Sequence, residues 1–234
     1  MDCFRRAKEG FEQLFGEDHA KTVEATYNLF YQTTWGNELI TELRALWERV
    51  NVSIPDEAIT YGVANELGEE LRRRGQFEEA KVIHLAALEG RRRVLGDEHI
   101  ETLGSLNNLG IVLKKMKDYE RALDNYQQAL RSTEKVLGKT HPETLRTIMN
   151  MATVYMDGLK DITKAEEVYR LALKGYERSL GKGHSDTKRC AMNLAILLFQ
   201  KVDDKMKTRE LVNDYPQLLE EGGGFGDYVR NYIQ

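Results

Sequence analysis

Apolar residues recur every three to four positions in paired segments of this chain, and the clearest pair spans residues 100–138. In the first segment the apolar positions have helical spacing: Leu103, Leu106, Leu109 and Leu113. In the second segment the stripe is Tyr119, Ala122, Leu123, Tyr126, Ala129, Leu130 and Val136. Lys117-Asp118 separates the two segments, and Gly138 follows the second as a helix terminator. The pattern predicts two antiparallel helices.

A short motif precedes each such pair: a glycine, a histidine three residues later, a threonine three further and an asparagine six further. It occurs as Gly16-His19-Thr22-Asn28, Gly96-His99-Thr102-Asn108, Gly138-His141-Thr144-Asn150 and Gly181-His184-Thr187-Asn193. The glycines are separated by steps of 80, 42 and 43 residues, so the first step conceals one more unit. Self-similarity with a period of ~20–50 residues is typical of solenoids, whose units bury their apolar faces against one another.

Shifting the clearest unit back by 42 residues reveals the hidden one. The shift aligns Thr60, Gly68, Ala80 and Ala87 with Thr102, Gly110, Ala122 and Ala129. In the hidden unit Glu66 replaces the asparagine. Gly68 and Gly110 stand where helices must cross closely, since a larger side chain would hold the backbones apart. His84 stands where other units carry Tyr126 and Tyr169, so we interpret it as a packing residue.

The register predicts about five helical pairs with irregular ends. Residues 1–16 match only a second helix, and the repeats follow at 17–53, 54–95, 96–137, 138–180 and 181–221. The fourth repeat carries one extra residue within 157–161, and Pro216 is expected to kink or break the last helix. Residues 222–234 are expected to form a glycine-rich hinge and tail. A start halfway through a repeat indicates a fragment or a larger parent chain.

Composition and net charge argue against two classes of function, nucleic-acid binding and insertion into a membrane. Charged residues make up 31% of the 234 and hydrophobic residues 41%, a soluble, helix-favouring balance. The net charge of −4 argues against nucleic acid as a partner, because binding its backbone needs a basic excess. No apolar run reaches the ~20 residues that cross a bilayer, and the polar start is unlike a signal peptide. We therefore expect a cytoplasmic protein without membrane insertion.

The residues carry a resemblance to a known family. Asn108-Leu109-Gly110, followed by Tyr119, Ala122, Tyr126 and Ala129, resembles the tetratricopeptide repeat pattern. The 42-residue spacing and the linker at 137–144, Leu-Gly-x-x-His-Pro-x-Thr, resemble the kinesin light chain subclass. The resemblance implies an all-α, right-handed superhelical solenoid of helix-turn-helix repeats. It also implies a concave groove that binds a partner peptide.

The asparagines of the motif are the first candidates for peptide contacts: Asn28, Asn108, Asn150 and Asn193. A polar amide at a packed position would waste hydrogen bonds, so we expect these side chains on the open inner surface. One amide can donate to and accept from a peptide backbone at once, and in the family that this chain resembles the position lines the groove. A solvated or locally capping asparagine is the alternative.

Basic residues on the same face suggest the charge of the ligand. Arg146 and Arg189 each precede a motif asparagine by one helical turn, and Lys114 lies one turn beyond Gly110. This arrangement resembles a carboxylate clamp, because a guanidinium makes two charge-assisted bonds to a carboxylate. Gly104, Gly62 and Glu24 stand at the matching upstream positions, so the expected acidic segment would lie in the C-terminal half. Solvated surface cations are the alternative.

No catalytic residue, metal ligand or cofactor site is expected. The linker histidines belong to different repeats and form a row that cannot converge on one metal ion: His19, His99, His141 and His184. We expect them to help start the following helices. Cys190 has no histidine one turn away. With Cys3 it is expected to be a small buried residue in a reducing compartment.

The sequence therefore predicts a protein-interaction scaffold similar to a kinesin light chain adaptor, with kinesin or microtubule machinery as one candidate partner. Two other classes remain. One is a fragment of the repeat array of a larger signalling protein, of the type that joins an ATPase to such repeats. The other is an RNA-reading helical repeat, against which the acidic balance counts.

Overall fold

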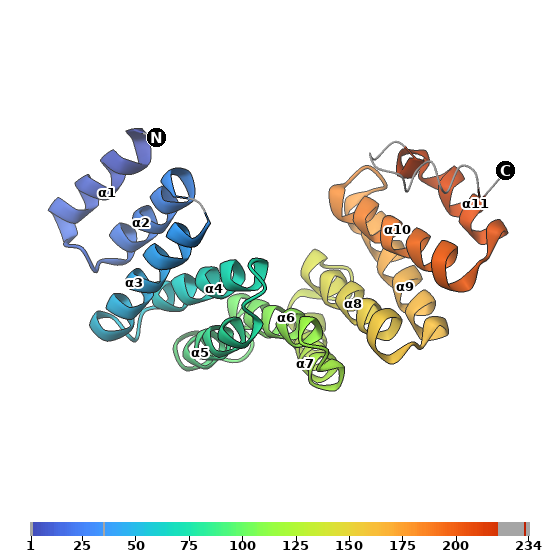
Figure 1. The fold of residues 1–234 in the computed structure, drawn as a ribbon, viewed down its shortest axis with the longest axis horizontal. Helices are drawn as coiled ribbons and strands as arrows, with labels where there is room; N and C mark the ends of the chain where they lie inside the picture. Colours follow the sequence, from blue (N-terminus) through green and yellow to red (C-terminus); the bar gives the residue numbers. More distant parts are fainter. Residues whose placement is uncertain (1, 35, 220–231, 233–234) are drawn as a thin grey trace. The chain divides into compact units, whose positions relative to one another are not determined.

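The computed structural model describes residues 2–34, 36–219 and 232, and within them it contains helices, turns and no strand (Figure 1). The chain forms two compact units, Met1–Asp118 and Tyr119–Gln234. The hinge and tail expected at 222–234 lie outside the described residues, apart from Tyr232. None of the described helices is both long and apolar enough to cross a bilayer.

The first unit runs from α1 to α6, and each helix packs against the next. The helices are α1 (Asp2–Phe15), α2 (Ala20–Thr33), α3 (Asn37–Ser53), α4 (Ala58–Arg73), α5 (Phe77–Leu95) and α6 (Ile100–Lys115). Packing also joins α2 to α4 and α4 to α6. The first helices of successive repeats therefore lie side by side within this unit.

The second unit runs from α7 to a short helical turn after α11. It comprises α7 (Tyr119–Leu137), α8 (Pro142–Val154), α9 (Ile162–Leu180), α10 (Ser185–Leu197) and α11 (Lys205–Asp214). α8 packs between α7 and α9, and α9 packs between α8 and α10. α11 ends at Asp214, and Pro216 begins the 3-10 turn Pro216–Leu219, so the last helix breaks where the proline predicts.

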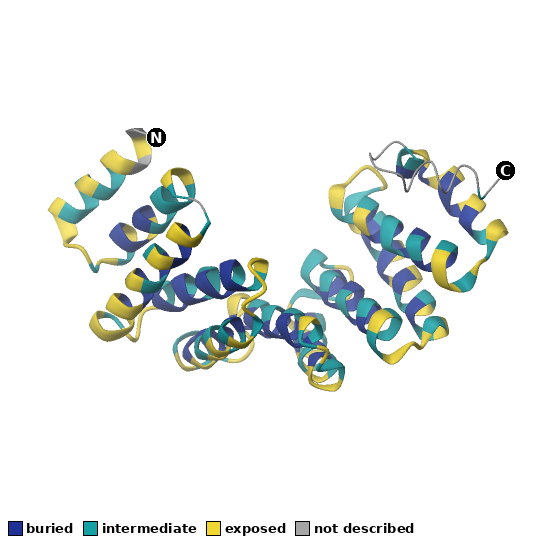
Figure 2. Ribbon diagram, viewed as in Figure 1, coloured by how far each residue is buried: buried dark blue, intermediate teal, exposed yellow. Residues whose placement is uncertain are grey.

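Each unit has its own hydrophobic core. In the first, fully enclosed Leu43, Val63 and Leu67 come from α3 and α4. In the second, Tyr169 of α9 and Leu194 of α10 are fully enclosed. Burying one such leucine contributes about 1.5–3 kcal/mol. Figure 2 shows buried residues on α3 to α10 and none on the described part of α1.

The linker motif is explained by three local interactions. The glycines adopt a left-handed backbone, with φ of +90° at Gly138 and +82° at Gly181, which other residues rarely adopt. The histidine then caps the next helix: Nδ1 of His141 accepts a hydrogen bond of 3.2 Å from the backbone N–H of Glu143. The threonine closes the turn, since Oγ1 of Thr144 donates to the carbonyl of Gly138 at 2.9 Å. His19, His99 and His184 cap their helices in the same way.

The extra residue of the fourth repeat lies within a helix end. α8 continues as a π turn over Tyr155–Leu159, which is wider than an α turn, and Lys160 then adopts φ of +57°. The fifth repeat ends its first helix in the same way, with a π turn over Leu198–Val202. The insertion therefore leaves the buried stripes of α8 and α9 in register.

The expectation for the cysteines holds for one residue only. Cys190 is fully buried on α10, and burial raises the pKa of its thiol to about 12. Cys3, by contrast, is exposed on α1. The prediction of a buried Cys3 was wrong because α1 contributes no described residue to the hydrophobic core.

His84 is the packing residue that its register predicts. It is fully buried on α5, and a Cβ atom added to Gly68 of α4 would lie 2.8 Å from its ring. Neither ring nitrogen has a hydrogen-bond partner among the described residues. Burial lowers the pKa of His84 from 6.5 to about 4, so the folded protein holds this ring neutral.

The first prediction concerns the helix cap. Changing His141→Ala removes the acceptor for the Glu143 N–H and should lower the free energy of unfolding by about 1 kcal/mol. His141→Asp restores an acceptor and should keep most of that stability. Urea unfolding of the three proteins measures the difference. Equal stability of the alanine and aspartate variants would contradict the capping role.

The second prediction concerns pH. Because protonation of His84 is favoured in the unfolded chain, the free energy of unfolding should be highest above pH 6.5 and fall as the pH decreases toward 4. The full loss is about 3 kcal/mol. His84→Tyr, the residue type at the matching position of the next two repeats, should remove this part of the dependence. Urea unfolding at several pH values, compared between the two proteins, tests the assignment.

Candidate peptide-binding surface

The candidate residues lie on the first helices of the repeats, and the helical register fixes their direction. Asn28, Asn108, Asn150 and Asn193 are all half-buried, on α2, α6, α8 and α10. Each follows the capping histidine of its helix by nine residues, so the linker sets the same starting point for all four. The register predicted from sequence therefore gives the four amides the same helical position and a similar degree of burial.

Two of the four amides are constrained by their surroundings. Nδ2 of Asn108 donates a 2.8 Å hydrogen bond to Oδ1 of Asn65 on α4. Nδ2 of Asn150 is buried and has no hydrogen-bond partner within the described residues. Asn108 thus joins two neighbouring helices, and the Asn150 nitrogen is not open to solvent. Neither amide is simply solvated.

In the first unit this surface is acidic. Glu66 takes the asparagine position on α4 and accepts a 2.8 Å hydrogen bond from the Tyr31 hydroxyl of α2. Burial, followed by the carboxylates of Glu24, Glu66 and Glu101, raises the pKa of Tyr27 above its usual value. Carboxylates therefore lie near both tyrosines of α2, and one of them, Glu101, is paired with Arg91 at 3.2 Å. The asparagine position itself is acidic in the second repeat, which disfavours an acidic ligand there.

In the second unit the same helical face carries arginines. Arg146 of α8 is ion-paired with Glu143, and its Nε lies 3.1 Å from the Glu143 carboxylate. Arg189 of α10 is paired with Asp186 at 2.5 Å, and 54% of its side chain is exposed. Each arginine is thus held by an acidic residue one turn earlier on its own helix. The third basic candidate, Lys114, is half-buried on α6 and belongs to the first unit.

A tyrosine of α9 links the two arginines electrostatically. Burial raises the pKa of Tyr176, the Asp186 carboxylate raises it further, and the charges of Arg189 and Arg146 oppose the rise. Both guanidinium groups therefore lie within electrostatic range of one phenol. The structure brings these two candidates into the same part of the second unit. Met149, the residue before Asn150, belongs to the hydrophobic core and is 5% exposed.

Sequence reasoning missed Asn65, the hydrogen-bond partner of Asn108. A signal was present, because Asn65 and Asn107 stand 42 residues apart at one register. The motif position of the second repeat is Glu66, so the motif shows no asparagine in that repeat. Asn65, one residue earlier, did not stand out for this reason.

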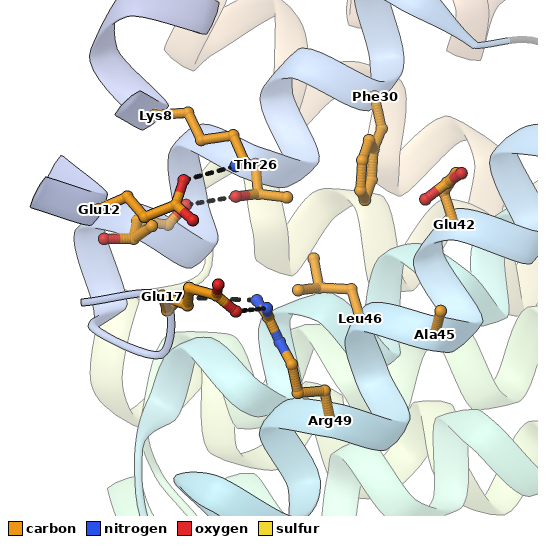
Figure 3. Close-up of a pocket in the computed structure, with 10 residues that line it drawn as sticks. Lys8, Glu12, Glu17, Thr26, Phe30, Glu42, Ala45, Leu46 and Arg49 are labelled. Atoms are coloured by element: carbon orange, nitrogen blue, oxygen red, sulfur yellow. Dashed lines mark hydrogen bonds and ion pairs between the residues drawn. The ribbon is translucent and has the colours of Figure 1, made fainter. Parts of the chain in front are cut away.

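A hollow of about 280 Å³ opens between α1, α2 and α3, with Phe30 and Leu46 among its lining residues (Figure 3). Two ion pairs line it: Lys8 with Glu12 at 2.7 Å, and Arg49 with Glu17 at 2.9 Å. Lys8 and Arg49, the two cations that line the hollow, are therefore each paired with a carboxylate. Glu42, which also lines the hollow, takes part in no ion pair with a described residue, so the charge left over at this hollow is acidic.

Comparison with known proteins agrees with this architecture. Family models described as tetratricopeptide repeats match residues 56–135, 104–158 and 144–186, together more than half of the chain. The chain belongs to the tetratricopeptide repeat family. It is an all-α solenoid of paired helices, as its periodicity predicts. No curated protein matches the sequence.

Solved structures show the same fold at low identity. BtubC (BKLC) from P. vanneervenii gives a TM-score of 0.77 at 17% identity, over 93% of this chain and 88% of that protein. The TPR-like repeats of a putative kinesin light chain from Podosopora anserina give 0.69 at 16%, over 86% and 96%. The apo form of RapI gives 0.73 at 17%, over 99% of this chain and 62% of its own. The resemblance to kinesin light chain-like repeats therefore holds for the fold.

The third prediction separates a structural asparagine from a free one. Asn108→Ala breaks the bond to Asn65 and should lower the free energy of unfolding by about 1 kcal/mol. The matched change Asn28→Ala, at the same helical position but with no hydrogen bond to a described residue, should leave stability within about 0.5 kcal/mol. Urea unfolding compares the two. An equal loss in both variants would mean that the Asn108–Asn65 bond adds nothing.

Proposed function

We propose that this chain is a protein-interaction scaffold that holds an acidic segment of a partner against α8 and α10. Tetratricopeptide repeats are scaffolds for protein–protein interaction, which gives the general class. The proposal adds that the bound segment is acidic and that it lies against α8 and α10. Arg146, Arg189, Asn150 and Asn193 are the residues proposed to contact it.

The arginine pair is the observation that carries the proposal. Arg146 and Arg189 stand at one register on α8 and α10, successive first helices, and each lies one turn before a motif asparagine. A peptide that crosses α8 and α10 would meet both guanidinium groups in turn. Glu66, which takes the asparagine position on α4 in the first unit, supports this choice because a carboxylate there disfavours an acidic ligand.

The existing ion pairs leave room for a ligand. An exposed pair such as Arg189–Asp186 contributes only about 0–1 kcal/mol, because solvent screens it. A guanidinium group has five N–H donors, more than a single carboxylate can use. A peptide carboxylate can therefore be added to each pair or replace its acidic member. Glu143 and Asp186 would then orient the arginines for binding.

The finer role that we propose is a cytoplasmic adaptor similar to a kinesin light chain, without catalytic activity. The 42-residue repeat and the fold shared with a putative kinesin light chain support this choice. Kinesin or microtubule machinery is the partner to test first. The runner-up is a repeat array within a larger signalling protein, which would bind an intramolecular acidic segment by the same residues.

The fourth prediction tests the arginine pair directly. A labelled library of aspartate- and glutamate-rich peptides is titrated against the intact chain, and the best binder is kept. Arg146→Gln/Arg189→Gln should weaken that binder about 10-fold or more, because two charge-assisted bonds are lost. Fluorescence anisotropy measures the affinity.

The matched control is Lys164→Gln/Arg170→Gln on α9. These two cations are also ion-paired and similarly exposed, 44% and 46%, and they lie outside the proposed surface. The control should bind the peptide as the unchanged protein does. Equal weakening by both double variants would reduce the effect to net charge and overturn the proposal, as would the absence of any acidic binder.

A further inference from the structure

A second hollow, lined by residues of α7, α8 and α9, lies within the second unit. Its volume is about 380 Å³, within the range of about 300–1,000 Å³ that ligand pockets occupy. The lining comes from the last turns of α7, the α7–α8 linker, the first half of α8 and the second half of α9. Its residues are Glu134, Lys139, Thr140, Leu145, Ile148, Leu171, Lys174, Gly175 and Arg178.

The floor of this hollow is apolar. Leu145 and Ile148 of α8 are 2% and 5% exposed, whereas Leu171 at the edge is 60% exposed. Gly175 allows the close contact that holds the floor together, since a Cβ atom there would lie 2.3 Å from a methyl group of Leu145. An apolar side chain inserted here would meet Leu171 and cover a large hydrophobic group that now faces water.

The edge of the hollow is basic, and its cations have no ion-pair partner in the described part of the chain. No hydrogen bond or ion pair with another described residue involves the side chains of Lys139, Lys174 and Arg178. Glu134 is the single acidic residue among the described lining residues. Elsewhere on α9 a cation is neutralised, as Arg170 is by Glu166 at 2.9 Å. The first hollow, between α1, α2 and α3, also pairs its lysine and arginine (Figure 3).

This hollow is on a different face of α8 from the arginine surface. At about 100° per residue, Leu145 and Ile148 lie roughly 150° around the helix from Arg146 and Asn150. A ligand in the hollow would therefore leave the arginine surface free. The two sites can be tested independently.

We propose that the hollow binds a partner segment in which one large apolar side chain is flanked by carboxylates. The apolar side chain packs on Leu145, Ile148 and Leu171, and the carboxylates pair with the lysine and arginine side chains around them. The net positive lining selects against a basic segment. The chain would then carry two peptide sites on opposite faces of α8, which lets one scaffold hold two partners, or two segments of one partner.

The probe is an amidated Asp-Glu-Leu-Glu-Asp peptide, titrated against the intact chain and followed through backbone amide chemical shifts by NMR. We expect shifts at Gly175 and Leu171 and binding about 10-fold tighter than that of Asp-Glu-Ser-Glu-Asp, because only leucine fills the apolar floor. Lys-Lys-Leu-Lys-Lys should leave the Gly175 and Leu171 signals unshifted. Equal affinity of the leucine and serine peptides, or shifts confined to the arginine surface, would overturn the proposal.

Matched variants separate the site from general effects. Leu171→Glu should weaken the peptide about 10-fold, while Val82→Glu, at an equally exposed position (60%) on α5, should not. Lys174→Glu should weaken it, and Lys205→Glu on α11 should not. Arg146→Gln/Arg189→Gln should leave the shifts at Gly175 and Leu171 unchanged while removing any binding of the probe at the arginine surface, which distinguishes this site from the fourth prediction. Equal effects within either matched pair, or binding to anionic lipid vesicles in place of the peptide, would contradict a peptide site.

Discussion

The linker between repeats is the constraint on which the rest of this structure depends. A left-handed glycine reverses the chain, a histidine caps the next helix, and a threonine hydroxyl holds the turn closed at 2.8–2.9 Å. Together they fix where α2, α8 and α10 begin. Because an α-helix turns by about 100° per residue, fixing the start also fixes which face every later residue occupies. Core residues and candidate ligand contacts thus have their directions set by one turn.

This dependence explains how α8 serves two surfaces at once. Its start at Pro142 directs Leu145 and Ile148 toward the apolar hollow and Arg146 toward the opposite side. A change of one residue in the linker would rotate both sets together. The π turn at Tyr155–Leu159 absorbs the extra residue after this surface, so the insertion does not disturb it. In the fourth and fifth repeats a π turn ends the first helix.

Local polar contacts decide which motif asparagines are free to bind. Asn108 and Asn28 share a register, yet of these two described residues only Asn108 donates to a neighbouring helix, because α4 places Asn65 beside it. The charge of the surface also differs between the two units, although the register is the same. Glu66 and Glu24 are the acidic residues of the first unit at these positions, whereas Arg146 and Arg189 are the cations of the second. A repeated backbone therefore carries different chemistry in its two units.

The sequence by itself determined the periodic features of this protein. Helix pairing, the capping histidines, the packing role of His84 and the break at Pro216 all follow from local propensity and a 42-residue period. Only the tertiary structure decided what depends on neighbouring helices: the exposure of Cys3, the Asn65 partner of Asn108, and the gathering of cations around Leu171. The physical reason is distance along the chain. Local interactions act within a few residues and repeat with the sequence, whereas these features depend on which neighbouring helices pack together: the Asn108–Asn65 bond joins residues one repeat apart, and the hollow around Leu171 takes residues from three elements.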